Sequence, residues 1–173
     1  MTVMDIALRF FDLCLFKAGP EDVPASSWLM KITLVIYFIL GIAIGRIDST
    51  WNASLFISLA DLLVMMLAIN VLLRFRGFQA RYQQTVTAMA GAGCCLGIIG
   101  FPVLVLFYQV GEQARFSSIA MLLMVGLMFW SLMVTAHILR KSLEIKPGTA
   151  AAITIAYTVL SLLVAGLALS GVT

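Results

Sequence analysis

Charged side chains are scarce in this sequence, and histidine is almost missing. The 173 residues include 11 Lys and Arg, 8 Asp and Glu and one His, so 11% of the chain is charged, whereas soluble domains average about 25%. Hydrophobic residues make up 62% of the chain, and the mean hydropathy is +1.09. These values exclude a soluble domain and indicate an integral membrane protein.

The motifs of common catalytic and metal sites are missing as well. The sequence contains no G-x-S-x-G elbow, no P-loop and no H-E-x-x-H pair. A single His and three Cys without zinc-type spacing do not make a metal site, and no basic run with interleaved aromatics points to nucleic acid. We therefore expect no catalytic residue, no cofactor, no bound metal and no nucleic-acid partner, and we expect that the protein is not an enzyme.

Five segments are each apolar enough and long enough to cross a bilayer, which takes about 20 residues of helix. Short gaps separate them, so consecutive helices are expected to be antiparallel neighbours in one bundle. The predicted fold class is all-α: a polytopic membrane helix bundle with five transmembrane helices (residues 28–173) after an N-terminal region (residues 1–27). The predicted spans are Trp28–Ile47, Leu55–Leu73, Val86–Tyr108, Ile119–Leu139 and Ala150–Gly171.

Lys and Arg alternate between the two sides of this predicted bundle. One side carries Arg9, Lys17, Lys31, Arg74, Arg76, Arg81, Arg140, Lys141 and Lys146, and the other carries only Arg46 and Arg115. Because cytoplasmic loops are enriched in Lys and Arg, we expect a cytoplasmic N-terminus. With an odd number of spans, the C-terminus is then expected on the opposite side of the membrane.

The first 27 residues predict a cytoplasmic amphipathic helix followed by a connector. Asp5, Arg9 and Asp12 interrupt an apolar run at helical spacing, and a turn-rich stretch with two prolines follows at residues 18–27. Two placements are open for this helix. It either lies flat at the membrane interface or packs against the cytoplasmic end of the bundle.

The third span is unusually rich in glycine. Gly93 and Gly97 form a G-x-x-x-G pair, which lets another helix backbone approach closely. Pro102 follows and predicts a kink. We assign Gly93, Gly97 and Pro102 to helix packing, with a partner helix in the same chain or in a second copy, and the sequence does not determine the oligomeric state.

Asp61 is the one acidic residue well inside a predicted span. A charge near mid-membrane costs several kcal/mol and marks a functional candidate by default. Ser58 shares its helical face, and Thr135 and Thr158 are candidate partners, which makes these four residues the candidate intramembrane polar site. The full set of candidate hydroxyl partners is Ser131 and Thr135 on the fourth span and Thr154, Tyr157, Thr158 and Ser161 on the fifth.

Two interpretations of Asp61 are open. It is either a protonatable group in an ion or solute path, or a hydrogen-bonded residue that ties helices together. A paired-aspartate protease would need a second buried acid, which the sequence lacks. The basic gaps likewise either hold anionic lipid headgroups or act only as orientation signals.

The organisation of the chain resembles that of Yip1-like membrane proteins, particularly the small bacterial members. The residues that carry the resemblance are RYQQTVTAMAGAGCCLGIIGFP entering the third span, FWSLMVTAHILRKSLEI ending the fourth, and AAITIAYTVLSLL in the fifth. The amphipathic N-terminus before five spans fits as well. The resemblance implies a bacterial inner-membrane location, which would make the expected C-terminal side periplasmic.

Two functions are compatible with these features. The first is a non-enzymatic scaffold or accessory subunit that binds other membrane proteins or lipids, since the loops are short and the catalytic motifs are missing. The second is a small transporter or channel component with Asp61 as its protonatable group. A water-accessible cavity that reaches Asp61 would favour the second, and a filled bundle would favour the first.

Overall fold

The computed structural model describes residues 3–109 and 114–170, and over those residues every regular element is a helix. Five of the described helices are long and apolar enough to cross a membrane. A shorter helix, α1 (Val3–Cys14), precedes them. The five long helices are α2 (Ser27–Gly45), α3 (Trp51–Arg76), α4 (Tyr82–Gln109), α5 (Ala114–Leu143) and α6 (Pro147–Ser170). The predicted all-α bundle of five spans is therefore confirmed.

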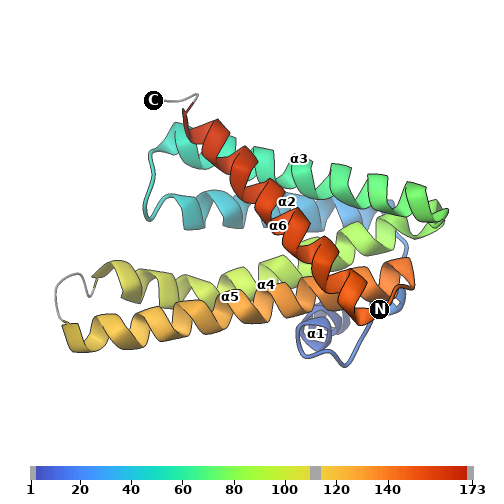
Figure 1. The fold of residues 1–173 in the computed structure, drawn as a ribbon, viewed down its shortest axis with the longest axis horizontal. Coiled ribbons are helices and arrows are strands. Elements are labelled where there is room, and N and C mark those ends of the chain that lie inside the picture. The colour runs from blue at the N-terminus through green and yellow to red at the C-terminus, as the bar shows by residue number, and fades with distance from the viewer. Residues whose placement is uncertain (1–2, 110–113, 171–173) are drawn as a thin grey trace.

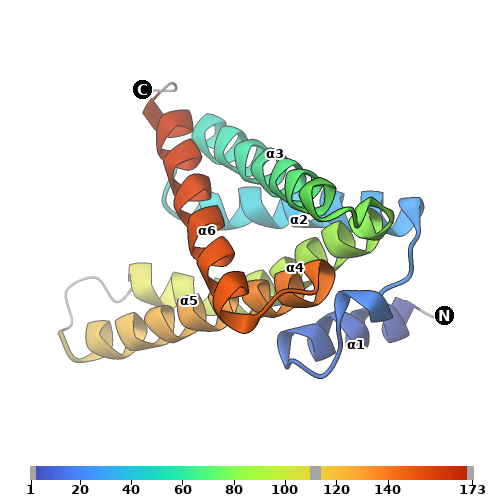
Figure 2. The ribbon, with the colours of Figure 1, turned by 45° about the vertical axis from the view of Figure 1, so that its right-hand side comes forward.

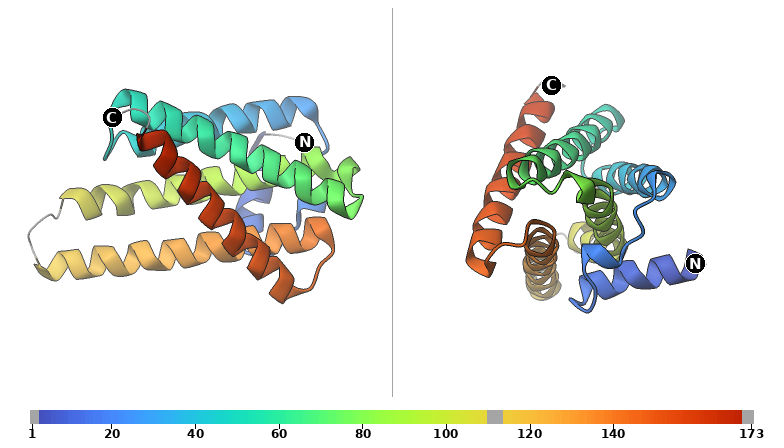
Figure 3. Two further views of the ribbon diagram at one scale, coloured as in Figure 1. Left: turned by 45° about the horizontal axis from the view of Figure 1, so that its top comes forward. Right: turned by 90° about the vertical axis from the view of Figure 1, so that its right-hand side faces the viewer.

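Two antiparallel pairs, α2 with α3 and α4 with α5, make up most of the bundle (Figure 1). Seen end-on, α4 lies in the middle, where it packs against α2, α5 and α1 (Figure 3). The last span, α6, crosses obliquely over α3 and α5 (Figure 2). Consecutive helices pack as expected, but α3 packs more extensively on α6, and α4 on α2, than α3 and α4 pack on each other.

Most ends of the long helices lie a few residues beyond the predicted apolar segments because local caps, and not hydropathy, determine them. The helix α2 differs, since it ends at Gly45, two residues before the predicted Ile47. The predicted end of the fifth span at Gly171 lies outside the described residues. The Thr50 hydroxyl accepts a hydrogen bond from the Ala53 amide at 3.4 Å and starts α3. Gly77, with φ of 74°, takes the left-handed conformation that ends the same helix. The first span starts in the same way, with Ser26 accepting from the Leu29 amide at 3.4 Å.

The glycines of α4 allow its neighbours to approach closely. A Cβ on Gly93 would lie 2.5 Å from Cε2 of Tyr37, and one on Gly97 would lie 3.3 Å from Cδ1 of Ile44, both on α2. The G-x-x-x-G pair therefore faces a helix of the same chain. Pro102 is exposed and α4 continues through it as one helix, so the predicted kink stays a prediction.

The helix α1 packs against the side of α4 and α5. Phe10 lies directly over Gly91 of α4, where there is no room for a Cβ. The Trp130 indole of α5 donates a hydrogen bond to the Cys14 carbonyl at 2.9 Å. Leu13 and Cys14 are fully buried. One face of α1 is thus held by the bundle, as one of the two open placements requires.

The opposite face of α1 is also apolar. The exposed side chains Met4, Leu8 and Phe11 recur at helical spacing, and Leu15 follows directly after the helix. A location at the membrane interface therefore stays a prediction.

The hydrogen bond with the Cys95 thiol, and then burial, raise the pKa of Cys14, the last residue of α1, well above its usual range. The Cys14 thiol is therefore neutral at physiological pH and acts as a packing residue.

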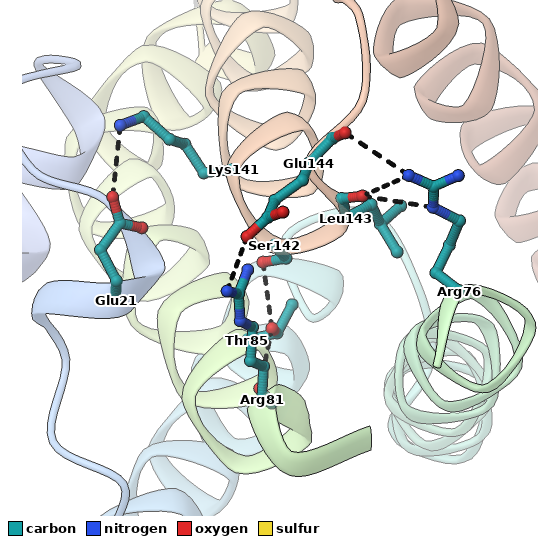
Figure 4. Close-up of polar contacts among 8 residues, drawn as sticks. All are labelled: Glu21, Arg76, Arg81, Thr85, Lys141, Ser142, Leu143 and Glu144. Carbon is teal, nitrogen blue, oxygen red and sulfur yellow. Dashed lines mark hydrogen bonds and ion pairs between the residues drawn. The ribbon is translucent and has the colours of Figure 1, made fainter. Parts of the chain in front are cut away.

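The end of the bundle that carries Arg74–Arg81 and Arg140–Lys146, here called the basic end, is held together by polar contacts (Figure 4). Arg81 pairs with Glu144 at 2.7 Å, and Lys141 pairs with Glu21 at 3.2 Å. Arg76 donates to the Leu143 carbonyl from Nε at 3.3 Å and from Nη2 at 3.2 Å. A cation at the carbonyl end of α5 is favourable for that helix.

We predict that Gly93→Ala destabilises the protein, because the new methyl group would overlap the Tyr37 ring and force α2 away from α4. Overpacking of this kind costs about 1–3 kcal/mol. The matched control is Gly126→Ala on α5, where a Cβ would meet no described atom within 4 Å; it should be neutral or stabilising by up to about 1 kcal/mol. Thermal unfolding in mild detergent measures both, and equal melting temperatures for the two variants would contradict the close approach.

Candidate intramembrane polar site

Asp61 lies well inside the bundle, about 15 Å along α3 from Trp51 and about 22 Å from Arg76 at 1.5 Å per residue. Tyr37 of α2 donates a hydrogen bond to its Oδ2 at 2.6 Å, and Ser161 of α6 donates to its Oδ1 at 2.6 Å. Both distances are at the short end of the range for O–H···O hydrogen bonds. The carboxylate therefore joins three helices, and each of its oxygens has one hydroxyl donor.

These two hydrogen bonds do not offset the free-energy cost of placing Asp61 inside a membrane helix. An Asp at the centre of a membrane helix costs about 2.5–3.5 kcal/mol on insertion scales. Hydrogen bonds between membrane helices contribute about 0.6 kcal/mol each on average, so two of them offset less than half of that cost. A serine or asparagine would join the helices at lower cost, which favours a role for Asp61 that needs a carboxylate.

A cavity of about 510 Å³ surrounds this carboxylate. All five spans contribute to its wall, and most of the wall is apolar. The polar and small residues that line it are Tyr37, Gly41 and Gly45 of α2, Ser58 and Asp61 of α3, Gly93 and Gly97 of α4, Ser131 and Thr135 of α5, and Tyr157, Thr158 and Ser161 of α6. Asp61 is half-buried and lies on the wall of this space.

The cavity has a neighbour on the side away from the basic end of the bundle. A second hollow of about 310 Å³ shares Ile44, Gly97 and Ser131 with the first and reaches Leu104 of α4 and Met124 of α5. Apart from Ser131 and the glycines, its wall consists of Ile, Leu and Met side chains. The second hollow therefore adjoins the Asp61 cavity between α2, α4 and α5, on the side away from the basic loops.

Toward the basic end the bundle is filled. Ile69 and Leu73 of α3, Val86 of α4 and Leu143 of α5 are 0–2% exposed. The Thr85 hydroxyl donates to the Ser142 hydroxyl at 3.0 Å within this packed region (Figure 4). We call this filled region the plug, and it separates the Asp61 cavity from the Arg81–Glu144 and Lys141–Glu21 pairs.

Asp61 has titratable neighbours but no charged neighbour among the described residues that line the cavity. Tyr37 of α2 and Tyr157 of α6 lie on its wall. The Cys94 thiol of α4 interacts electrostatically with Tyr37. The described wall residues of α5 contribute hydroxyl and apolar groups only. His137 is turned elsewhere, with its Nε2 3.1 Å from the Ala18 carbonyl of the connector.

The four residues predicted as a polar site lie on this one cavity. Ser58, Thr135 and Thr158 line it together with Asp61, but none of them provides the two hydrogen bonds to the carboxylate. The Thr158 hydroxyl donates to the Thr154 carbonyl of its own helix at 2.9 Å, as membrane Ser and Thr residues often do. One of the two bonds to the carboxylate comes from Ser161, another of the predicted hydroxyl partners, and the other comes from Tyr37.

Tyr37, Gly41 and Gly45 were not predicted as part of the site. Tyr37 stands in the middle of an apolar span, where an aromatic side chain is indistinguishable from a packing residue. Gly41 and Gly45 do carry a sequence signal, because they form a second G-x-x-x-G pair. A Cβ on Gly41 would lie 3.0 Å from the Ser58 hydroxyl, so this pair brings α2 close to α3.

No family model, curated protein or solved structure matches this chain. The resemblance to Yip1-like proteins therefore stays a prediction.

We predict that Tyr37→Phe destabilises the protein by about 0.6 kcal/mol and by at most about 1.7 kcal/mol, the average and the largest values measured for hydrogen bonds between membrane helices. Tyr157→Phe is the matched control, because the Tyr157 hydroxyl shows no hydrogen bond to Asp61 among the described contacts; it should leave the stability unchanged. Unfolding in mixed detergent micelles gives both free energies. Equal losses in the two variants would show that the Tyr37–Asp61 bond contributes nothing.

Proposed function

We propose that this protein is a non-enzymatic membrane carrier or channel component, in which Asp61 is the protonatable group that binds the transported species. The single observation that carries this proposal is the cavity of about 510 Å³ inside the bundle, with Asp61 on its wall. Intramembrane acids that face a cavity are typical of ion and solute paths. A filled bundle would instead have favoured a purely structural role.

The difference between the two ends of the cavity supports the same proposal. The second hollow adjoins it on the side away from the basic loops, whereas the plug closes the side toward Thr85 and Ser142. A carrier in one of its access states has this form, with the binding site open to one side and sealed from the other. Transport would then require the plug to open while the hollow side closes.

One observation favours the scaffold or accessory-subunit function as a second candidate. The helix α1 packs on α4 and α5 and carries an exposed apolar stripe on its other face. The stripe consists of Met4, Leu8 and Phe11, with Leu15 directly after the helix. Such a stripe suits lipid or the apolar surface of another membrane protein. This candidate does not use Asp61, so a flux experiment separates the two.

We predict that proteoliposomes containing the protein dissipate an imposed pH or cation gradient, and that Asp61→Asn abolishes this flux. The substitution keeps the shape of the side chain and one of its two acceptor oxygens but removes its charge. Entrapped pH- and ion-sensitive dyes measure the flux across a panel of inorganic and organic cations. Gly126→Ala on α5, which lies outside the described wall of the cavity and where a Cβ meets no described atom within 4 Å, is the control for folding and should retain most of the flux.

Equal flux through wild type and Asp61→Asn, or none through either, would overturn the carrier function. If a membrane partner also co-purified with the inactive protein, and deletion of the α1 stripe released it, the scaffold function would take its place. The fold of each variant is checked by its melting temperature in detergent before reconstitution.

We also propose that the protein resides in a bacterial inner membrane with the basic end in the cytoplasm. Nine Lys and Arg belong to the basic end or the N-terminal region, and two belong to the other side. Because such an excess sets the orientation of short-loop membrane proteins, the N-terminus would be cytoplasmic and the C-terminus periplasmic. The hollow side of the Asp61 cavity would then face the periplasm.

Reporter fusions to the full chain test this orientation in bacterial cells. We predict fluorescence from green fluorescent protein attached before Met1, and alkaline phosphatase activity when the phosphatase follows Thr173. The first reporter matures only in the cytoplasm and the second only in the periplasm. Activity of the phosphatase at the N-terminus, or of neither reporter at its expected end, would reverse or exclude the proposed orientation.

A further inference from the structure

The Asp61 cavity is far larger than a proton or a bare metal ion needs. Its volume of about 510 Å³ falls within the range of about 300–1,000 Å³ found for small-molecule pockets. A second hollow of about 310 Å³ adjoins it and shares part of its wall. The size of the space therefore indicates an organic ligand.

The charge of the wall selects the sign of that ligand. Asp61 is the only ionic side chain among the described residues that line the cavity. A single carboxylate suits a monovalent cation, because divalent ions such as Ca²⁺ take six to eight oxygen ligands, commonly from several carboxylates. Among the described residues, no cluster of three His, Cys, Asp or Glu side chains is placed to hold a metal.

The rest of the wall suits the apolar body of such a cation. Tyr37 and Tyr157 present aromatic rings on two different helices, and Met65, Met89 and Met128 provide flexible thioethers. Aromatic rings attract organic cations through cation–π interactions, and quaternary ammonium ligands are often recognised in this way. Methionine side chains adapt to apolar bodies of varied shape.

From this combination we infer that the cavity binds a lipophilic monovalent organic cation, with its charge against Asp61, an aromatic contact from Tyr157, and its apolar body in the methionine-lined space. This inference rests on the proposed function, since it names the class of species that the Asp61 site binds. Tyr37 is already engaged with Oδ2 of the carboxylate, which leaves its ring and the exposed side of Asp61 to the ligand.

The probe is tritiated tetraphenylphosphonium, and its binding to the purified full chain in detergent is measured at equilibrium. Wild type should bind it saturably, and Asp61→Asn should weaken binding about 30-fold or more, as expected when a buried charge loses its partner. Tyr157→Leu should weaken binding about 3- to 30-fold through loss of the cation–π contact. Tyr157→Phe, which keeps the ring, should bind within about threefold of wild type.

Neutral triphenylphosphine oxide, similar in shape but uncharged, is the ligand control and should not displace the probe. Asp61→Glu keeps the charge and should retain saturable binding, which guards against loss of binding through misfolding. Binding that is the same in wild type and Asp61→Asn, or displacement by the neutral analogue, would overturn the inference. A rise in melting temperature with Na⁺, without any binding of the probe, would assign an inorganic cation and overturn it too.

The outcome is separable from that of the flux experiment. Flux that depends on Asp61, without tetraphenylphosphonium binding, would leave the carrier function standing and remove only the organic-cation class. Binding that depends on Asp61 and Tyr157, without flux of any cation, would leave the binding site standing and remove the carrier function.

Discussion

A carboxylate in the hydrocarbon layer has to find its hydrogen-bond donors within the protein, since lipid offers none. Asp61 finds them on α2 and α6, the helices that carry Tyr37 and Ser161. These two donors come from the first and the last of the five long helices, so one side chain connects three helices. The same residue lies on the wall of the cavity.

This arrangement depends in turn on where glycine lets helices approach. Gly93 leaves the room that the Tyr37 ring occupies, and Gly41 leaves the room beside the Ser58 hydroxyl. Larger residues at these two positions would separate α2 from α4 and from α3, and the Tyr37 hydroxyl would move away from Asp61. Helix packing and the geometry of the site therefore depend on the same residues, because the glycines that let α2 approach its neighbours also position the Tyr37 hydroxyl beside Asp61.

The five spans and the inward direction of Asp61 were predictable from the sequence, because lipid imposes a length and a polarity on every crossing segment. Ser161 was one of several hydroxyls at suitable depth. Tyr37 was not predictable, since its bond to Asp61 depends on the rotation of α2, which is decided by packing against α3 and α4. The placement of α1 was open for a similar reason, as both of its faces are apolar and suit either the bundle or lipid.

The basic end carries exposed ion pairs, whereas the plug beside it is packed with apolar side chains. This difference bears on how the plug would open. The Arg81–Glu144 and Lys141–Glu21 pairs are about half exposed, and exposed pairs contribute about 0–1 kcal/mol each. Burial of a Leu, Ile or Met side chain contributes about 1.5–3 kcal/mol where it is shielded from water. Several such side chains fill the plug, so apolar packing, and not the ion pairs, sets the barrier there. Movement of α5 against α3 and α4 is the change that would separate those side chains, because each of the three helices contributes to the plug.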